Sequence, residues 1–155
     1  MSKKIRGFEF VSDEMMRNKG EFVFHQLPKR STKNSAGYDF VLPKNIALLP
    51  HDQVFVWSDV KAYMKKNEVL ELHIRSSLGK KGIILANCTG IIDSDYYNNQ
   101  DNEGNIGFML YNHSDALIEL MGGTKIMQGI FHKYLLADDD DAGDERKGGI
   151  GSTGK

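Results

Sequence analysis

Short apolar runs follow one another along most of the chain, and polar or proline-containing turns separate them. Residues 54–57 and 69–74 are rich in β-branched and aromatic side chains, which favour strands. Only residues 13–19 and the stretch after Val60 have a helical pattern, and both are brief. Many short strands at this spacing predict an all-β sandwich, barrel or jelly roll. The strands are expected at 5–11, 22–24, 40–42, 46–49, 54–57, 69–74, 83–85, 106–111, 116–120 and 125–136.

Two segments differ from this pattern. Residues 97–105 are almost entirely polar, which predicts a hairpin loop between two strands. After residue 137 the chain carries an acidic run at 138–141 and then a glycine-rich stretch at 148–154. A segment of this composition cannot bury a core of its own, so we expect a β domain at 1–137 and a mobile tail at 138–155. Glycines also let successive N–H groups converge on an anion, so the tail is either a frayed terminus or a phosphate-binding flap.

Composition and charge exclude several classes of protein. The 155 residues include 20 basic and 21 acidic side chains, a net charge of -1, which argues against a nucleic-acid partner. The single cysteine, Cys88, excludes an internal disulfide and a multi-cysteine metal site. There is no apolar run of the roughly 20 residues that a membrane span needs, and no signal-like segment at the N-terminus. We therefore expect a cytoplasmic protein without a membrane partner.

Two short motifs carry candidate chemistry. Arg75, Ser76 and Ser77 follow a predicted strand, and a guanidinium with two hydroxyls suits phosphate oxygens. The alternative is a short helix beginning at Ser76, with Arg75 in solvent. Asp93 and Asp95 follow another predicted strand, where a carboxylate is either part of a surface turn or a general base for water.

Five segments in the order of the chain resemble the five motifs of the homotrimeric dUTP diphosphatases, or dUTPases. They read AGYDF (36–40), RSS (75–77), NCTGIIDSDY (87–96), GTKIMQ (123–128) and RKGGIGSTG (146–154). The third and fifth are the specific ones, and the chain is most similar in style to enzymes of Gram-positive bacteria and their phages. The resemblance implies a distorted jelly-roll subunit, a three-fold trimer and three active sites at subunit interfaces. The implied reaction is Mg²⁺-dependent hydrolysis of dUTP to dUMP and pyrophosphate, which keeps uracil out of DNA and supplies dUMP.

The resemblance also implies a role for individual residues. Asp93 would activate the water that attacks the α-phosphorus, and Tyr96 would lie under the deoxyribose and exclude a 2′-hydroxyl. Asp39 would contact Mg²⁺ through water, the metal being held mainly by the triphosphate. The tail would close over a neighbouring subunit's site. The implied substrate-binding residues are Arg75, Ser76, Ser77, Asn87, Gly90, Ile91, Ile92, Tyr96, Gln128, Arg146, Ile150, Gly151, Ser152 and Thr153.

The chain departs from the family pattern at Ile150, where phenylalanine usually stacks on uracil, and at Lys125, where arginine is commoner. The first change predicts weaker closure over the base, and the second keeps the charge but loses the guanidinium fork. The residues of the third motif also bear on two other functions. A dCTP deaminase would need a glutamate in the segment 90–96, which has none. A non-catalytic regulatory protein on the same fold would be favoured by loss of the base, but Asp93 is present.

Overall fold

The structure is a computed structural model that describes residues 4–152. It consists of short strands, a short α-helix, α1 (Ser76–Gly79), and a 3₁₀ helix, η1 (Ser94–Tyr96). Thr153, expected in the phosphate-binding tail, lies outside the described residues. The strands are β1 (Gly7–Phe10), β2 (Lys29–Arg30), β3 (Tyr38–Val41), β4 (Ile46–Leu48), β5 (Gln53–Trp57), β6 (Val60–Tyr63), β7 (Glu68–Ile74), β8 (Ile83–Leu85), β9 (Gly90–Asp93), β10 (Gly107–Asn112), β11 (Ile118–Leu120) and β12 (Lys125–Lys133).

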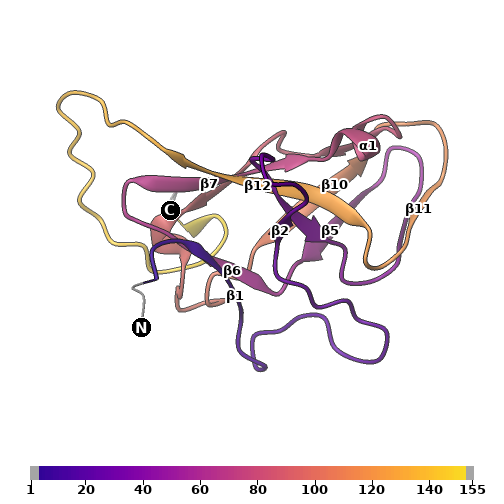
Figure 1. Cartoon of the computed structure of the whole chain (residues 1–155), viewed down its shortest axis with the longest axis horizontal. Helices are drawn as coiled ribbons and strands as arrows, with labels where there is room; N and C mark the ends of the chain where they lie inside the picture. Colours follow the sequence, from indigo (N-terminus) through magenta and orange to yellow (C-terminus); the bar gives the residue numbers. More distant parts are fainter. Residues whose placement is uncertain (1–3, 153–155) are drawn as a thin grey trace.

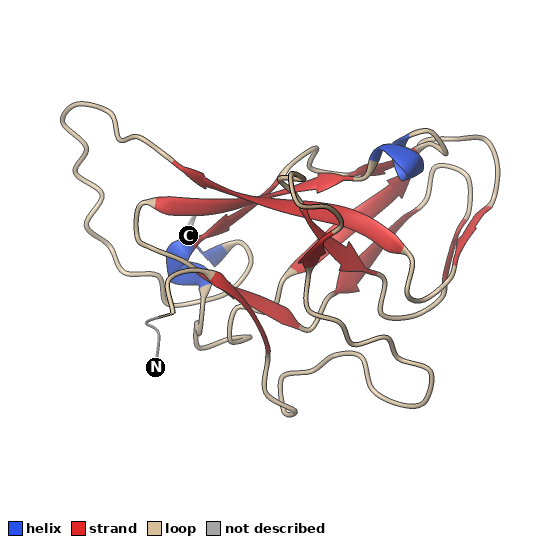
Figure 2. Ribbon diagram, viewed as in Figure 1, coloured by secondary structure: helices blue, strands red, loops and turns tan. Residues whose placement is uncertain are grey.

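The strands form small antiparallel sheets that enclose one core, as a distorted jelly roll does (Figures 1 and 2). The largest sheet has the order β2-β3-β12-β7-β9, and a second has the order β5-β10-β8. The strand pairs β1-β6 and β11-β4 form two further, two-stranded sheets. In Figure 1, β7 and β12 cross the upper part of the view, with β1 and β6 below them. The all-β expectation is therefore confirmed.

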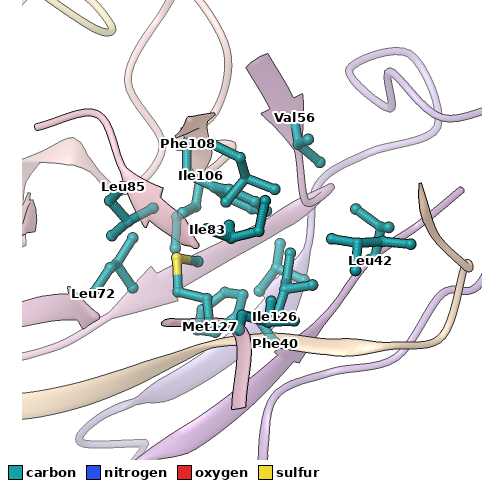
Figure 3. Packing of buried hydrophobic residues seen from close by; sticks show 14 of the residues in the cluster. Phe40, Leu42, Val56, Leu72, Ile83, Leu85, Ile106, Phe108, Ile126 and Met127 are labelled. Carbon is teal, nitrogen blue, oxygen red and sulfur yellow. The ribbon is translucent and has the colours of Figure 1, made fainter. Parts of the chain in front are cut away.

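The core lies between these sheets because alternate side chains of each strand point inward. In β10 the burial alternates residue by residue, so Phe108 and Leu110 are buried. Figure 3 shows Leu72 of β7 and Met127 of β12, which belong to the largest sheet, packed with Leu85 of β8 from the second sheet. Burying a side chain of this kind stabilises the fold by about 1.5–3 kcal/mol. This packing fixes the ends of β7, β8 and β9, where the candidate site residues are found.

Three sequence-based predictions of secondary structure are wrong. Residues 22–24 form no strand, and the Phe22 side chain is 88% exposed. The stretch after Val60 is the strand β6, because Val60 and Ala62 point into the core with period two. Residues 13–15 form a turn and residues 16–19 no regular structure, since the N–H groups of Arg17 and Asn18 donate to the Asp59 carboxylate and not to helical carbonyls.

The polar segment 97–105 is also not a hairpin loop. It joins β9, which pairs with β7, to β10, which pairs with β5 and β8, so it connects two different sheets. Asn99, Asn102 and Asn105 are buried within it. Its polar side chains bond the loop to itself, which explains how a segment with almost no apolar residues can be compact.

The tail after β12 leaves the body and then returns to it (Figure 1). Leu135 and Leu136 are exposed, whereas Gly148 and Gly149 are buried against the body.

The short helix α1 does begin at Ser76, as one interpretation of that motif required. Across residues 4–152, no helix has both the length and the apolar character needed to span a membrane.

Candidate active site

Asp93 lies where β9 ends and η1 begins. It is opposite Val69 of β7, and its side chain is 51% exposed. Tyr96 follows on the inner side of η1, and its ring is buried. The Tyr96 hydroxyl donates to the Asn105 carbonyl oxygen at 2.8 Å and accepts from Asn102 Nδ2 at 2.9 Å. Burial raises the pKa of Tyr96, so the hydroxyl stays protonated at neutral pH. The turn thus presents a carboxylate beside a fixed aromatic ring.

A cavity of about 390 Å³ opens beside this turn, a volume within the usual range for small-molecule sites. Its lining includes the residues of the third motif that were expected to contact the nucleotide, together with part of the tail. Strand β9 is the edge of its sheet, so the backbone groups on its outer side have no partner strand. The cavity is lined by Phe55, Leu72, Leu85, Asn87, Gly90, Ile91, Ile92, Asp93, Tyr96, Gly107, Phe108, Met109, Arg146, Ile150 and Gly151.

Arg146 of the tail joins the two carboxylates at the mouth of this pocket. Its Nη2 donates to Asp93 Oδ2 at 2.5 Å, and its Nε donates to Asp95 Oδ1 at 2.8 Å. The guanidinium carbon also lies 5.7 Å from the centroid of the Tyr96 ring. Charge-assisted contacts of this kind are among the stronger polar interactions, and only 8% of the Arg146 side chain is exposed. The contact lies within one chain, and the crossing of the tail to a neighbouring subunit stays a prediction.

A second group of candidate residues surrounds the buried carboxylate of Asp39 in β3. Asp39 accepts from Ser31 Oγ, and its oxygens lie 3.1 Å from Lys125 Nζ and 3.3 Å from Arg75 Nε. Burial alone would raise the pKa of Asp39, but the bonds from Ser31 and Lys125 and the charge of Arg75 outweigh it and lower the pKa. We call Asp39, Ser31, Arg75 and Lys125 the Asp39 cluster. Arg75 is therefore held by a carboxylate and is not simply solvated.

Gln128, Ser76 and Ser77 lie next to this cluster in the fold. Gln128 of β12 is in register with Asp39, and a Cβ atom at Gly37 would be 2.5 Å from Gln128 Oε1. Gly37 thus leaves the room that the amide occupies. Ser76 and Ser77 open α1, and both are exposed. These hydroxyls and the cations of the cluster form a surface that suits phosphate oxygens.

The pocket and the Asp39 cluster lie at opposite ends of β7. Asp93 is opposite Val69, whereas Arg75 follows the last residue of the strand. Six residues of extended chain span roughly 20 Å, so a single chain does not bring Asp93 and Arg75 together. The structure therefore groups the predicted residues into two half-sites.

Sequence reasoning missed several residues at these half-sites. Phe55 and Met109 line the pocket, and Ser31 bonds to Asp39. The sequence predicts Phe55 and Met109 only as strand residues, because adjacency across a sheet is not visible in one sequence. Within residues 4–152 there is no group of three or more His, Cys, Asp or Glu side chains that could hold a metal ion.

A β fold with a nucleoside-sized pocket, a carboxylate at its mouth and a glycine-rich tail on top defines a nucleotide-binding protein. The comparisons specify which one, because the family model named dUTPase matches residues 25–154. The chain belongs to the dUTPase family.

Individual relatives agree with this assignment. The chain is 42% identical over 154 residues to the deoxyuridine 5'-triphosphate nucleotidohydrolase of Lactococcus lactis subsp. lactis (strain IL1403), covering 97% of this chain and 99% of that one. It resembles the crystal structure of dUTPase from Streptococcus mutans with a TM-score of 0.73 and 41% identity, covering 85% of this chain and 98% of that one. A dUTPase from phage phi11 of S. aureus, described with a structural Mg(II) ion, shares the fold at 18% identity and a TM-score of 0.69, with 91% and 98% of the two chains covered.

Proposed function

We propose that the chain hydrolyses dUTP to dUMP and pyrophosphate, with Asp93 as the general base. The observation that carries the proposal is the half-exposed Asp93 carboxylate, which lines a cavity together with Asn87, Tyr96 and the edge strand β9. Membership of the dUTPase family supports the choice of substrate. Any dUTP-hydrolysing protein of this family needs a base, a uracil-reading surface and phosphate-binding groups, and the chain carries candidates for each.

The reaction would proceed in one displacement. Asp93 accepts a proton from a water molecule, whose oxygen forms a bond to the α-phosphorus. The bond from that phosphorus to the oxygen bridging to the β-phosphate breaks, and the electron pair leaves with pyrophosphate. In the structure Asp93 Oδ2 accepts a hydrogen bond from Arg146, and the half-exposed carboxylate keeps Oδ1 as an acceptor for the water. The negative charge of a triphosphate gives the guanidinium an alternative partner.

The pocket would select the base and the sugar. The outer backbone groups of the edge strand β9, around Ile91 and Ile92, would supply donors and acceptors for the uracil edge together with the Asn87 amide. A base with a different edge leaves buried polar groups unpaired, which discriminates strongly. Gly90 packs against Leu72, where an added Cβ atom would be 3.0 Å from the Leu72 side chain. Tyr96 is fixed by two hydrogen bonds and would stand where a ribose hydroxyl would collide.

The phosphates would be bound by groups from both half-sites. Arg75, Ser76, Ser77 and Gln128 provide one set, and Arg146, Gly151 and Ser152 provide another. Ser152 Oγ is buried and, within the described part of the chain, is the side-chain polar atom that lacks a hydrogen-bond partner. An unpaired buried hydroxyl is costly, so a phosphate oxygen is a suitable partner for it. Thr153 would join this set, as the family resemblance implies.

Mg²⁺ would arrive with the triphosphate as part of the substrate and neutralise its charge. Asp39 is already flanked by Arg75 and Lys125, so its carboxylate is better placed to position these cations than to ligate a metal directly. The water-mediated contact of Asp39 with Mg²⁺ stays a prediction. Because Asp93 and Arg75 lie at opposite ends of β7, a complete site needs a second copy, which supports the trimer.

The test measures pyrophosphate release from dUTP and, in separate reactions, from dTTP, dCTP and UTP. Each nucleotide is assayed with and without Mg²⁺. We expect hydrolysis of dUTP alone, and only with Mg²⁺. Equal hydrolysis of UTP would contradict the role of Tyr96, and equal hydrolysis of dCTP would contradict the role of β9 and Asn87. A properly folded protein without turnover of dUTP would favour the regulatory alternative.

A further inference from the structure

The polar loop 97–105 has no role in the function proposed so far, yet its interior is highly ordered. The Asn99 side-chain oxygen accepts from the N–H groups of Asp101 and Asn102, at 3.0 and 3.2 Å. The Asn102 side-chain oxygen accepts from Asn99 Nδ2 and from the Gly104 N–H group. Buried amides that satisfy one another in this way hold a loop in one conformation. The loop is therefore a preformed surface.

That surface contacts the glycine-rich tail. Asp101 Oδ2 accepts the backbone N–H of Gly149 at 2.8 Å. A Cβ atom at Gly148 would lie 2.6 Å from Asp101 Oδ2, and one at Gly149 would lie 2.9 Å from Asn102 Nδ2. Both distances are shorter than real Cβ contacts, so a side chain at either position would force Asp101 or Asn102 to move. Loop and tail are complementary in shape as well as in hydrogen bonding.

The same loop reaches the wall of the pocket. Asn102, which lies against Gly149, donates its side-chain N–H to the Tyr96 hydroxyl at 2.9 Å. Gly151 and Ile150, which follow the docked glycines, line the pocket. The position of the tail is thus set relative to Tyr96 through one asparagine.

We propose that residues 97–105 are the docking site of residues 148–151 and that Asp101 is the positioning residue that holds the tail over the pocket. A substrate phosphate would compete with Asp93 and Asp95 for the guanidinium of Arg146, so the contacts that Arg146 gives the tail change when substrate binds. The bond between Asp101 and Gly149 does not involve the substrate and can persist while Arg146 moves. The contact has the same chemistry whether the tail belongs to the same chain or to a neighbouring subunit. Its effect on turnover rests on the proposed function.

The first test uses trypsin without any nucleotide. Trypsin cleaves after Arg146 and Lys147, next to the docked glycines. Asp101→Ala removes a charged hydrogen-bond acceptor, and we expect cleavage there to become roughly 10-fold faster. Asp101→Asn keeps an acceptor oxygen, so trypsin should cleave it at nearly the same rate as the unmodified protein. The matched control is Asp115→Ala, because the Asp115 side chain is 98% exposed on a different loop. Cleavage at the same rate in Asp101→Ala and Asp115→Ala would overturn the proposal.

A glycine pair tests the shape of the contact in the same assay. Gly148→Ala places a methyl group against Asp101 Oδ2, whereas at Gly143 the nearest atom to a Cβ would be Asp141 O at 3.8 Å. Gly148→Ala should speed tryptic cleavage by several-fold, and Gly143→Ala should leave it unchanged. Equal protection of the two variants would show that the tail does not dock through Gly148.

The second test links docking to turnover. Asp101→Ala should lower kcat/KM for dUTP by roughly 10-fold in the full chain, yet have no effect in a chain lacking residues 147–155. A loss of the same size in both backgrounds would mean that Asp101 acts through the loop and not through the tail, and would overturn the proposal. If the unmodified protein does not hydrolyse dUTP, the proposed function fails, and the trypsin experiment still decides whether the loop holds the tail.

Discussion

Replacing Asp93 by asparagine tests its role as the general base. Asp95 provides a matched control, so the effect of losing the base can be distinguished from the effect of losing an ion pair with Arg146. Asp93 and Asp95 both bind Arg146, and their side chains are 51% and 56% exposed. Only Asp93 lines the pocket. Asp93→Asn therefore loses an ion pair and the base, whereas Asp95→Asn loses an ion pair alone.

The two losses differ greatly in size. Arg146 is nearly buried, but the Asp95 carboxylate is 56% exposed, so water screens this ion pair. At about 1 kcal/mol for such a pair, Asp95→Asn should change tail docking and turnover by about 5-fold. Removing a positioned base costs about 10²–10⁴-fold in rate, or roughly 3–5 kcal/mol in the barrier. Neither side chain is buried, so the free energy of unfolding should change by less than about 0.5 kcal/mol in both variants.

The assay is the initial rate of pyrophosphate release at several dUTP concentrations, with urea unfolding and dUTP affinity measured on the same samples. We expect Asp93→Asn to keep the fold and the affinity and to lose kcat. Equal kcat in Asp93→Asn and Asp95→Asn would refute the assignment of the base. A parallel loss of affinity and kcat in Asp93→Asn would show that Asp93 binds the substrate and does not activate water.

Three further changes have defined outcomes. Ile150→Phe adds an aromatic ring at the pocket, where a stacked contact with the base is worth about 0.5–1.5 kcal/mol. The KM for dUTP in steady-state kinetics should therefore fall by roughly 3-fold to 10-fold. An unchanged KM would argue against contact between residue 150 and the base. The pKa of Asp39 is lowered in the fold, so its ion pairs stabilise the protein above the ordinary carboxyl value of 3.8, and that stability is lost as the pH falls from 3.8 through the lowered pKa. In urea titrations Asp39→Asn should therefore lose less stability between pH 4 and pH 2 than the unmodified protein, and the two should reach about the same value at low pH. Asp59 is fully buried and accepts hydrogen bonds from the N–H groups of Arg17 and Asn18. Asp59→Ala should therefore lower the free energy of unfolding, measured by urea titration, by about 3 kcal/mol. A loss below about 1 kcal/mol would contradict this role of Asp59.

The fold class and most strands could be predicted from the sequence because alternation and β-branched residues are local signals. The strand at 106–111, for example, is β10 (Gly107–Asn112), within one residue at each end. The prediction failed where tertiary contacts decide local structure. Residues 13–19 bind the Asp59 carboxylate, and β6 has only four residues in which to show its alternation.

The site was predicted less completely, and for a physical reason. The motif residues could be named from the resemblance, but one sequence does not show that Asp39 faces Arg75 and Lys125 or that Arg146 binds Asp93. The loop 97–105 was interpreted as a hairpin from its polarity alone. Its asparagines are buried because they bond to one another, and that property depends on spacing in three dimensions, not on composition.

The placement of Asp93 and Arg75 at opposite ends of β7 has a genetic consequence. In a ring of three subunits, Asp93→Asn removes the pocket half of a site and Arg75→Ala removes the phosphate half, so each variant alone is inactive. Every trimer that contains both variants has one subunit interface at which an intact pocket meets an intact Asp39 cluster. Subunits mixed in equal amounts and allowed to exchange should therefore recover about one quarter of the sites of the unmodified enzyme. Two inactive alleles of this gene would then complement each other inside a single cell.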